Sequence, residues 1–244
     1  MPIRDELVAR TIERLRSALE RLAVGEWSHG PTPDAHGPDA DERLHDLREI
    51  RREVERLYGT YVGSGSALVH RLGSEDLLGV LRSAGTVDGE RAYLLAALIE
   101  VDAAAIERDP HGADPELAEA LRIRALDLVL EAGLADVGET DVDDRVERLS
   151  ARVPPYRRAE ATWARLHAFA VARGAYARAE DTLFAWLAHA PDGSVAPAGR
   201  AYYAHLLTLS DEALEVGNLP RSEVEEGRGA FEEALTEAGV ASAS

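Results

Sequence analysis

Apolar residues recur at helical spacing along most of the chain, and alternating strand patterns are scarce. Near the start, a stripe with i, i+4, i+7 spacing predicts a first helix. A second helix is predicted from Leu44 to Gly59, where the apolar positions again keep a helical period. The stripe of the first helix consists of Ile3, Leu7, Thr11, Leu15, Ala18 and Leu22.

Helix start signals divide the middle of the chain. Ser74 precedes a short apolar segment, and Asp88 is placed to cap a longer one. Asp114 is followed by Pro115, a residue that is tolerated in the first turn of a helix. A further start falls at Thr140 or Asp141, so this part of the chain is predicted to hold several helices in series.

The C-terminal part shows the same organisation. Two helices meet at Gly174, another runs over 197–209, and the last begins at Pro220, where Ser222 and Glu225 have capping-box spacing. In total about ten helices joined by short turns are predicted, which excludes a doubly wound sheet. Short turns favour antiparallel neighbours, so the sequence predicts an all-α fold of helix hairpins stacked in a compact array.

Two breaks in the pattern suggest how the chain is organised. Residues 25–41 combine glycine, proline and aspartate without periodicity, which is typical of a mobile connector, and "GSGS" at 63–66 reads as a turn. We therefore expect an N-terminal helical hairpin over 1–70, interrupted by this connector. A second helical domain is expected over 71–244.

One segment, residues 160–193, resembles a tetratricopeptide repeat, a two-helix unit of about 34 residues. Trp163 and Leu166 match the large residues of its first helix. Gly174 matches the turn, while Tyr176 and Ala179 match the entry to the second helix. The resemblance implies tetratricopeptide-like packing, in which the small residue at the crossing lets the two helices approach closely.

The segment also departs from the repeat pattern. His167 stands where the family has a small residue, Ala170 where it has an aromatic one, and Trp186 where it has alanine. The concave face that the resemblance implies is lined by small residues with Arg165 as the only charge, and it suits a helix of the same chain better than a charged peptide tail. Its members are Ala161, Ala164, Ala168, Val171 and Ala172.

A second resemblance covers more of the chain. The blocks at 71–99, 174–187 and 203–227, of which the last contains "LPRSEVEEG", are similar to an uncharacterised bacterial family, a domain of unknown function with tetratricopeptide-like helices. This resemblance implies an architecture and no reaction.

Composition narrows the classes of function. The chain of 244 residues has no cysteine, which excludes disulfides and thiolate metal sites and fits a reducing cytoplasm. All 27 basic residues are arginine, and the net charge of -18 disfavours binding to nucleic acid or to an anionic membrane. The charged start and the lack of a long apolar run predict neither a signal peptide nor a membrane-spanning helix. We expect a cytoplasmic protein.

Charge is distributed unevenly. Residues 145–178 carry eight arginines against two glutamates, a balance of +6, whereas 211–237 carry nine acids against two arginines, a balance of -7. These segments either are two solvated helix faces or dock on one another, within a chain or between copies. The residues predicted to bind a partner are drawn from these two segments. They are Arg157, Arg158, Arg165, Glu223, Glu225 and Glu226.

No catalytic, cofactor-binding or metal-binding motif is recognised. Glu42 and His45 have the i, i+3 spacing of iron ligands in helical bundles, but no second pair of this kind exists. His167 lies within the apolar face of its helix and is expected to pack there, as are Trp163 and Trp186. We therefore expect no catalytic residue, no cofactor and no metal.

These observations favour a non-catalytic protein interaction or scaffold module. Its partner is expected to be a protein, and a second copy of this chain is one candidate. Nucleic acid and membrane are not expected as partners. Two alternatives stay open. One is a regulatory domain that acts on a separate enzyme, and the other is an enzyme without a recognisable signature, which a polar pocket with converging carboxylates and a histidine would favour.

Overall fold

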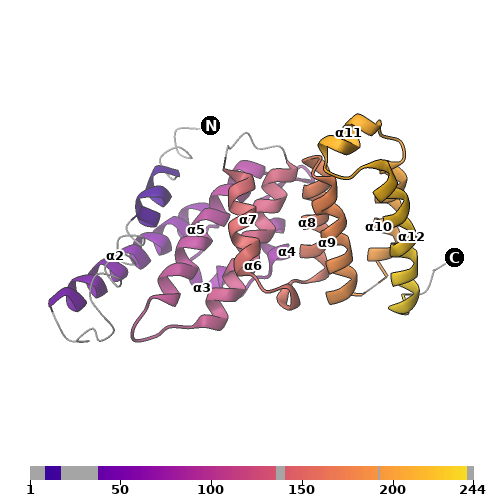
Figure 1. Ribbon diagram of the computed structural model, residues 1–244. Helices are drawn as coiled ribbons and strands as arrows, with labels where there is room; N and C mark the ends of the chain where they lie inside the picture. Colours follow the sequence, from indigo (N-terminus) through magenta and orange to yellow (C-terminus); the bar gives the residue numbers. More distant parts are fainter. Residues whose placement is uncertain (1–8, 18–37, 136–140, 192, 241–244) are drawn as a thin grey trace. The chain divides into compact units, whose positions relative to one another are not determined.

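Helices make up most of the chain that the computed structural model describes, which comprises residues 9–17, 38–135, 141–191 and 193–240 (Figure 1). The predicted all-α fold is confirmed. The chain divides after Leu149 into two compact units, Met1–Leu149 and Ser150–Ser244. The boundary expected at residue 70 lies inside the first of these units.

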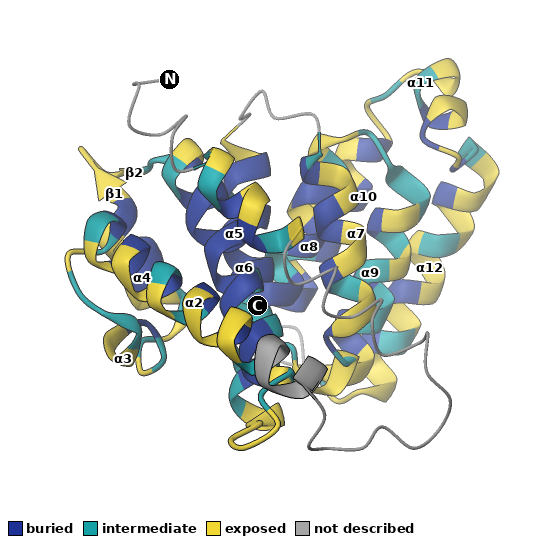
Figure 2. Ribbon diagram, turned by 90° about the vertical axis from the view of Figure 1, so that its left-hand side faces the viewer, coloured by how far each residue is buried: buried dark blue, intermediate teal, exposed yellow. Residues whose placement is uncertain are grey.

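The first unit is built around two long helices, α5 (Gly89–Glu107) and α6 (Pro115–Leu134), which pack along one another. Of the 19 residues of α5, 14 are buried, so α5 is a core helix that is covered on most sides, as Figure 2 shows. Around this pair lie α2 (Pro38–Tyr61), which packs on α5, and α4 (Ser74–Leu81), which contacts both long helices. The remaining elements are α3 (Ser66–Val69), β1 (Arg82–Ser83), β2 (Thr86–Val87) and α7 (Val142–Arg152), which continues into the second unit.

Both predicted aspartate caps of the long helices are confirmed. The side chain of Asp88 accepts a hydrogen bond from the backbone N of Arg91 at 3.1 Å. Asp114 accepts one from the backbone N of Leu117 at 2.9 Å, and Pro115 occupies the first turn of α6. Each cap satisfies a backbone donor that has no partner inside its helix.

A small antiparallel hairpin between α4 and α5 was not expected from the sequence. Arg82 pairs with Val87 and Ser83 with Thr86, across a two-residue turn in which Ala84 and Gly85 both have positive φ. Such a turn matches the twist of a hairpin. Strands of two residues are too short to show a period of two, so the pattern gave no signal.

The N-terminal helix and connector are only partly within the described residues. Residues 9–17 are helical and bury Ile12 and Leu15, in agreement with the predicted helix over that range. The expected connector over 25–41 lies outside the described residues up to residue 37. Its last four residues belong to α2, because Pro38 opens that helix, and a proline is suited to the first helical turn.

The second unit begins with a 3₁₀ turn, Pro155–Arg157, and a helix hairpin. Its arms are α8 (Glu160–Ala172) and α9 (Tyr176–His189), which pack together, and Gly174 has a φ of +69° at the turn between them. The boundaries predicted for this helix pair are therefore correct. The glycine is needed because other residues rarely adopt positive φ.

Three further helices complete this unit, and here the prediction was partly wrong. The helix expected over 197–209 is α10 (Val195–Leu206), followed by an additional short helix, α11 (Asp211–Val216), that Ser210 caps. The capping box at Ser222 is absent, because α12 (Arg221–Glu237) already begins after Pro220 and Ser222 lies within its first turn. Helix α12 packs on both α9 and α10.

Within the described ranges, no helix has the length and apolar character needed to cross a membrane.

Candidate functional site

An open groove lies in the first unit and has a volume of about 600 Å³. Its walls come from α2, α3 and α5, from the connection between α5 and α6, and from the start of α6. The apolar part of the lining is formed by Val54, Ile106 and Leu117. The polar and small residues of the lining are Arg51, Arg52, Glu55, Ser66, His70, Asp102, Gly112 and Asp114.

A histidine and an aspartate meet in this groove. Nε2 of His70, which directly follows α3, lies 2.7 Å from Oδ2 of Asp102 in the middle of α5. The hydroxyl of Tyr58 on α2 donates to the same oxygen at 3.0 Å. Asp102 and Tyr58 are buried, whereas the side chain of His70 is 23% exposed. The result is an oriented imidazole at the boundary between core and groove.

Burial and the neighbouring carboxylate act on Tyr58. Burial first, and the charge and hydrogen bond of Asp102 next, raise the pKa of this phenol well above its ordinary value. Tyr58 is therefore a permanent hydrogen-bond donor to Asp102 at neutral pH. Since a carboxylate can only accept, the hydrogen bond from His70 must also be donated from Nε2.

The wall beside this pair is formed by Glu55 and Ser66. The backbone N of Ser66 donates to Oε2 of Glu55 at 2.8 Å. Hydrogen bonds from the Ser66 side chain and then from its backbone hold the pKa of Glu55 below its ordinary value, so this carboxylate is charged at neutral pH. Asp114, which caps α6, supplies a further carboxylate to the lining.

The basic side of the groove is partly neutralised. Nη1 of Arg51 lies 2.6 Å from Oδ2 of Asp109, so Arg51 is held in an ion pair. Behind the histidine, Nη2 of Arg124 on α6 donates to the carbonyl oxygen of His70 at 3.2 Å, and burial lowers the pKa of this arginine. Both arginines thus position the groove wall.

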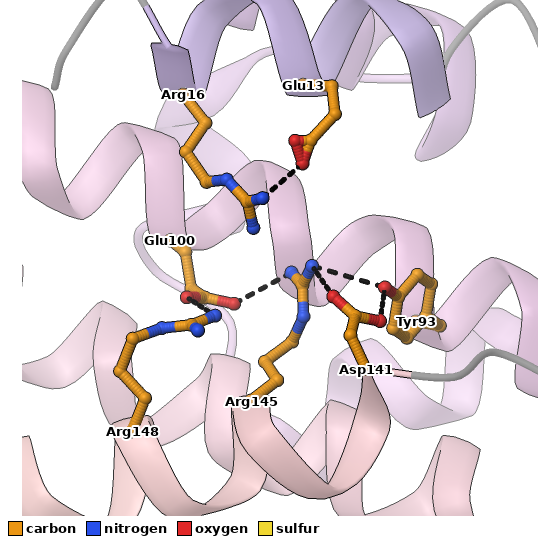
Figure 3. A network of polar contacts seen from close by, with 7 residues as sticks. All are labelled: Glu13, Arg16, Tyr93, Glu100, Asp141, Arg145 and Arg148. Atoms are coloured by element: carbon orange, nitrogen blue, oxygen red, sulfur yellow. Dashed lines mark hydrogen bonds and ion pairs between the residues drawn. The ribbon is translucent and has the colours of Figure 1, made fainter. Parts of the chain in front are cut away.

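A second polar network connects α5 with α7, and Figure 3 shows its members. Nη1 of Arg145 donates to Glu100 at 2.8 Å, and Nη2 donates to Tyr93 at 3.2 Å and to Asp141 at 3.1 Å. The Arg145 side chain is only 5% exposed, and Arg148 adds a further contact to Glu100. With both terminal nitrogens of its arginine engaged, this network is a brace between two helices.

Protonation in this network follows the same contacts. Burial alone would raise the pKa of Asp141, but the hydrogen bond from Tyr93 and the charge of Arg145 hold it below its ordinary value. Asp141 is therefore charged at neutral pH and pairs with a permanent cation.

The three arginines predicted to bind a partner lie at the start of the second unit. Arg157 is exposed in the 3₁₀ turn, and Arg165 is half-buried on α8. Arg158 is held by its own chain, because its Nη2 donates to the carbonyl oxygens of Ser150 at 2.6 Å and Val153 at 3.0 Å. Its guanidinium also lies 4.7 Å from the centre of the Trp163 ring.

The three predicted glutamates, Glu223, Glu225 and Glu226, are exposed on α12. Two ion pairs of α12 do not involve these three glutamates. Arg221 pairs with Asp211, and Arg200 pairs with Glu232 at 2.8 Å. On the basic segment, Arg145 and Arg148 pair with Glu100.

The aromatic and histidine residues of the α8–α9 hairpin have structural contacts. His167 is buried, and its Nδ1 lies 3.0 Å from the carbonyl oxygen of Ala179. Burial lowers the pKa of His167, although the hydrogen bond to Ala179 opposes the shift. Trp163 and Trp186 are buried, as expected of residues that build the fold.

Of the metal pair considered from the sequence, only His45 can be located. It is exposed and lies 3.6 Å from Glu49, one turn further along α2. The side chain of Glu42 lies outside the described residues. Among the residues that the structure describes, no group of three histidine or acidic side chains is arranged to hold a metal ion.

The groove was not predicted from the sequence. A signal did exist, because Asp102 interrupts the apolar run of α5 and a buried aspartate needs a partner. His70, its partner, lies 32 residues earlier and carries no local motif. The exposed Tyr156, between Pro155 and Arg157, was also overlooked.

A family model matches most of the chain. DUF6483, a family of unknown function, matches residues 3–235. No curated protein and no solved structure matches the chain.

Proposed function

The chain belongs to the DUF6483 family of unknown function, and we propose that it is a non-catalytic interaction module that binds a protein partner. The observation that carries this proposal is the 3₁₀ turn Pro155–Arg157. Its Tyr156 is 74% exposed and stands directly beside the exposed Arg157. Tyrosine and arginine are the residue types that most often dominate the energy of protein interfaces.

The turn is anchored at its end by the contacts of Arg158, which suits it to binding. Arg158 follows it at once and is tied to the carbonyl oxygens of Ser150 and Val153 and to the Trp163 ring. A side chain that is presented on a fixed backbone loses less conformational freedom when a partner docks, so more of the contact energy appears as affinity. Arg158 therefore contributes to binding by holding Tyr156 and Arg157 in place.

The neighbouring hairpin supports the same proposal. Helices α8 and α9 have the lengths, the glycine turn and the buried Trp163 of a tetratricopeptide-like unit. The face of α8 that includes Ala164 and Ala168 is half-buried to exposed, and its small side chains allow another helix to approach closely. A helical segment of a partner protein fits this face, next to Arg165.

The acidic segment offers a second contact of opposite charge. Glu223, Glu225 and Glu226 are exposed on α12, in the same unit as Arg157. A basic surface of a partner, or the basic segment of a second copy, would be attracted to them. Self-association of this kind is one version of the proposal.

The test uses the tagged full-length chain as bait in a lysate of its native cell, with quantitative mass spectrometry. We expect the amount of the captured partner protein to be lower by about fivefold or more with Tyr156→Ala than with the wild type, since truncating an interface anchor typically costs more than 1 kcal/mol of binding free energy. Arg157→Glu should have a similar effect. The matched control is Val216→Ala, which shortens another exposed apolar side chain of the same unit.

Two results would contradict the proposal. One is undiminished capture by both Tyr156→Ala and Arg157→Glu, and the other is equal loss with Val216→Ala, which would indicate non-specific adhesion. Self-association is measured separately by light scattering at about 50 mM and about 500 mM NaCl. If the mass of the oligomer is the same at both salt concentrations, self-association by charge pairing is ruled out.

A second candidate function, an enzyme without a recognised signature, is favoured by one observation. His70 is oriented by the buried Asp102 and lines an open groove, as a general base would. An activity screen with small substrates would have to show a reaction that is lost with His70→Leu.

A further inference from the structure

The groove of the first unit contains a histidine nitrogen that is left over for a ligand. Nε2 of His70 donates to Asp102, and the carbonyl oxygen of the same residue accepts from Arg124. Among the described residues, no hydrogen bond reaches Nδ1. In the neutral imidazole this nitrogen is an acceptor, and the ring lines the groove. The geometry therefore calls for a ligand that donates a hydrogen bond to His70.

The charges around the groove favour a ligand with positive charge. Three carboxylates, Glu55, Asp102 and Asp114, belong to the lining. Glu55 accepts from Ser66, Asp102 from Tyr58 and His70, and Asp114 from the backbone of Leu117. Apart from the imidazole these donors are neutral groups, so they do not cancel the three negative charges. The whole chain, with its net charge of -18, adds a field of the same sign.

The cations of the lining do not reverse this balance. Arg51 is neutralised by its ion pair with Asp109. Arg52 is exposed on α2 and has no ion-pair partner among the described residues, so it is the one place on the lining where an anion could bind instead. An experiment on this groove must therefore compare ligands of both signs.

The apolar lining limits the rest of the ligand. Val54 and Ile106 are already buried and form the apolar floor, so the apolar surface that a ligand can still cover here is that of the half-buried Leu117. A ligand with a few methylene groups would remove this remaining surface from water. A bare inorganic cation would not use it, and no three-ligand metal arrangement exists among the described side chains.

We infer that this groove binds a primary ammonium group carried on a short alkyl chain. The ammonium donates to Nδ1 of His70 and lies among the carboxylates of Glu55, Asp102 and Asp114, while the alkyl chain packs on Val54, Ile106 and Leu117. Such a group occurs in small free amines and in lysine side chains. The chain itself contains no lysine, so a lysine in the groove must come from another molecule. This inference does not depend on the proposed function.

The test is a titration of the full chain followed by NMR of the histidine ring nitrogens. The probes are n-butylammonium, butyrate and 1-butanol, which share an alkyl body and differ in charge. Butylammonium is expected to shift the Nδ1 resonance of His70 in a saturable way and to bind at least about fivefold more tightly than butyrate or butanol. Butyrate that binds as tightly or more tightly would overturn the inference and assign the groove to anions at Arg52.

Two variants locate the binding. Asp114→Asn keeps a good helix cap and removes one charge, so the affinity for butylammonium should fall by about threefold to tenfold. Asp88→Asn is the matched control, because Asp88 is the corresponding cap of α5 and does not line the groove. His70→Leu should lower the affinity by about tenfold or more, through loss of a hydrogen bond from a charged donor. Thermal unfolding checks that the His70 variant is folded.

The remaining arm distinguishes the source of the ammonium group. Nα-acetyl-lysine N-methylamide has an ammonium only at Nζ. Tighter binding of this compound than of butylammonium supports a lysine of a partner protein, and weaker binding supports a small free amine. Equal affinity of Asp114→Asn and Asp88→Asn for butylammonium, or an unperturbed His70, would overturn the site.

Discussion

Nε2 of His70 lies 2.7 Å from Oδ2 of Asp102, and this contact attaches a surface residue after α3 to the centre of the buried helix α5. Asp102 is one of the few polar residues in the core, and it accepts from His70 and Tyr58 at once. The groove wall is therefore part of the core of the first unit.

Removing the carboxylate of Asp102 should destabilise the protein. In Asp102→Leu the buried hydroxyl of Tyr58 and Nε2 of His70 lose their acceptor, and we expect the free energy of unfolding to fall by about 2 to 4 kcal/mol. Tyr58→Phe removes one donor and leaves Asp102 its bond from His70, so it should cost about 1 kcal/mol. Urea denaturation measures both. Equal costs would show that the carboxylate has no special role.

The α5–α7 brace predicts a contrast between two arginines. Arg145→Met leaves Glu100 and Asp141 without their buried cation, and should cost about 3 to 5 kcal/mol. Arg148→Met, at a side chain that is 42% exposed, also removes a contact to Glu100 but should cost less than about 1 kcal/mol. Denaturant titration of the two variants checks this ranking, and the reverse order would rule out the brace.

The environment of Glu180 predicts that the stability of the second unit depends on pH. Burial first, and then the charges of Asp181 and Glu223, raise its pKa above the ordinary 4.5, although a hydrogen bond from Tyr203 opposes the shift. A raised folded-state pKa means that the folded protein holds the proton more tightly. The stability that Glu180 contributes is therefore fully present below the unfolded-state pKa and is lost as the pH rises through the folded-state value.

The measurement is thermal unfolding from about pH 4 to pH 8. The loss of stability with rising pH should be smaller in Glu180→Gln than in the wild type. Glu225→Gln, at an exposed position of α12, is the control and should follow the wild-type curve. A Glu180→Gln profile parallel to that of the wild type would contradict the assignment.

The crossing of α8 and α9 should not tolerate a large residue at Ala179. This alanine is fully buried, and its carbonyl oxygen contacts His167. Ala179→Trp is expected to cost about 1 to 3 kcal/mol or more through overpacking, and to unfold the second unit at a lower temperature. Ala188→Trp, at an exposed position of α9, should have little effect. Calorimetry compares the two, and unchanged cooperative melting of Ala179→Trp would argue against this helix pair.

Two helical glycines of the second unit should respond to alanine with opposite signs. A methyl group on Gly199 would overlap the ring of Phe231 and approach Cδ2 of Leu183 to 3.0 Å, so Gly199→Ala should destabilise the unit. Gly229 in α12 has open space around it, and Gly229→Ala should raise stability by about 0.5 to 1 kcal/mol through helix propensity. Thermal melting of both variants shows whether the signs differ.

Much of the fold could be predicted because its causes are local. Asp88 and Asp114 cap helices through contacts three residues away, and Gly174 ends α8 by its own backbone preference. The boundaries of α8 and α9 follow from such signals. Where the prediction was wrong, as at Ser222, a neighbouring signal was stronger, since Pro220 had already set the start of α12.

The sequence shows where the charged residues are, but it does not show which of their side chains are available to a partner. The place of Arg158 in a basic segment predicts that it binds a partner, yet its guanidinium donates to the carbonyl oxygens of Ser150 and Val153. Tyr156, beside it, became the exposed side chain of the turn. Nothing in the order of residues distinguishes these outcomes, because they depend on where carbonyl groups and an indole ring lie in space.

The sequence by itself determined an all-α chain, its helix caps and its strongly acidic character, since each of these rests on composition or on residues a few positions apart. Only the tertiary structure decided the groove. His70 and Asp102 are 32 residues apart, and Tyr58 is 44 residues from Asp102. They meet because α3 and α5 both pack on α2, and helix packing is decided by side chains along whole faces rather than by any local motif.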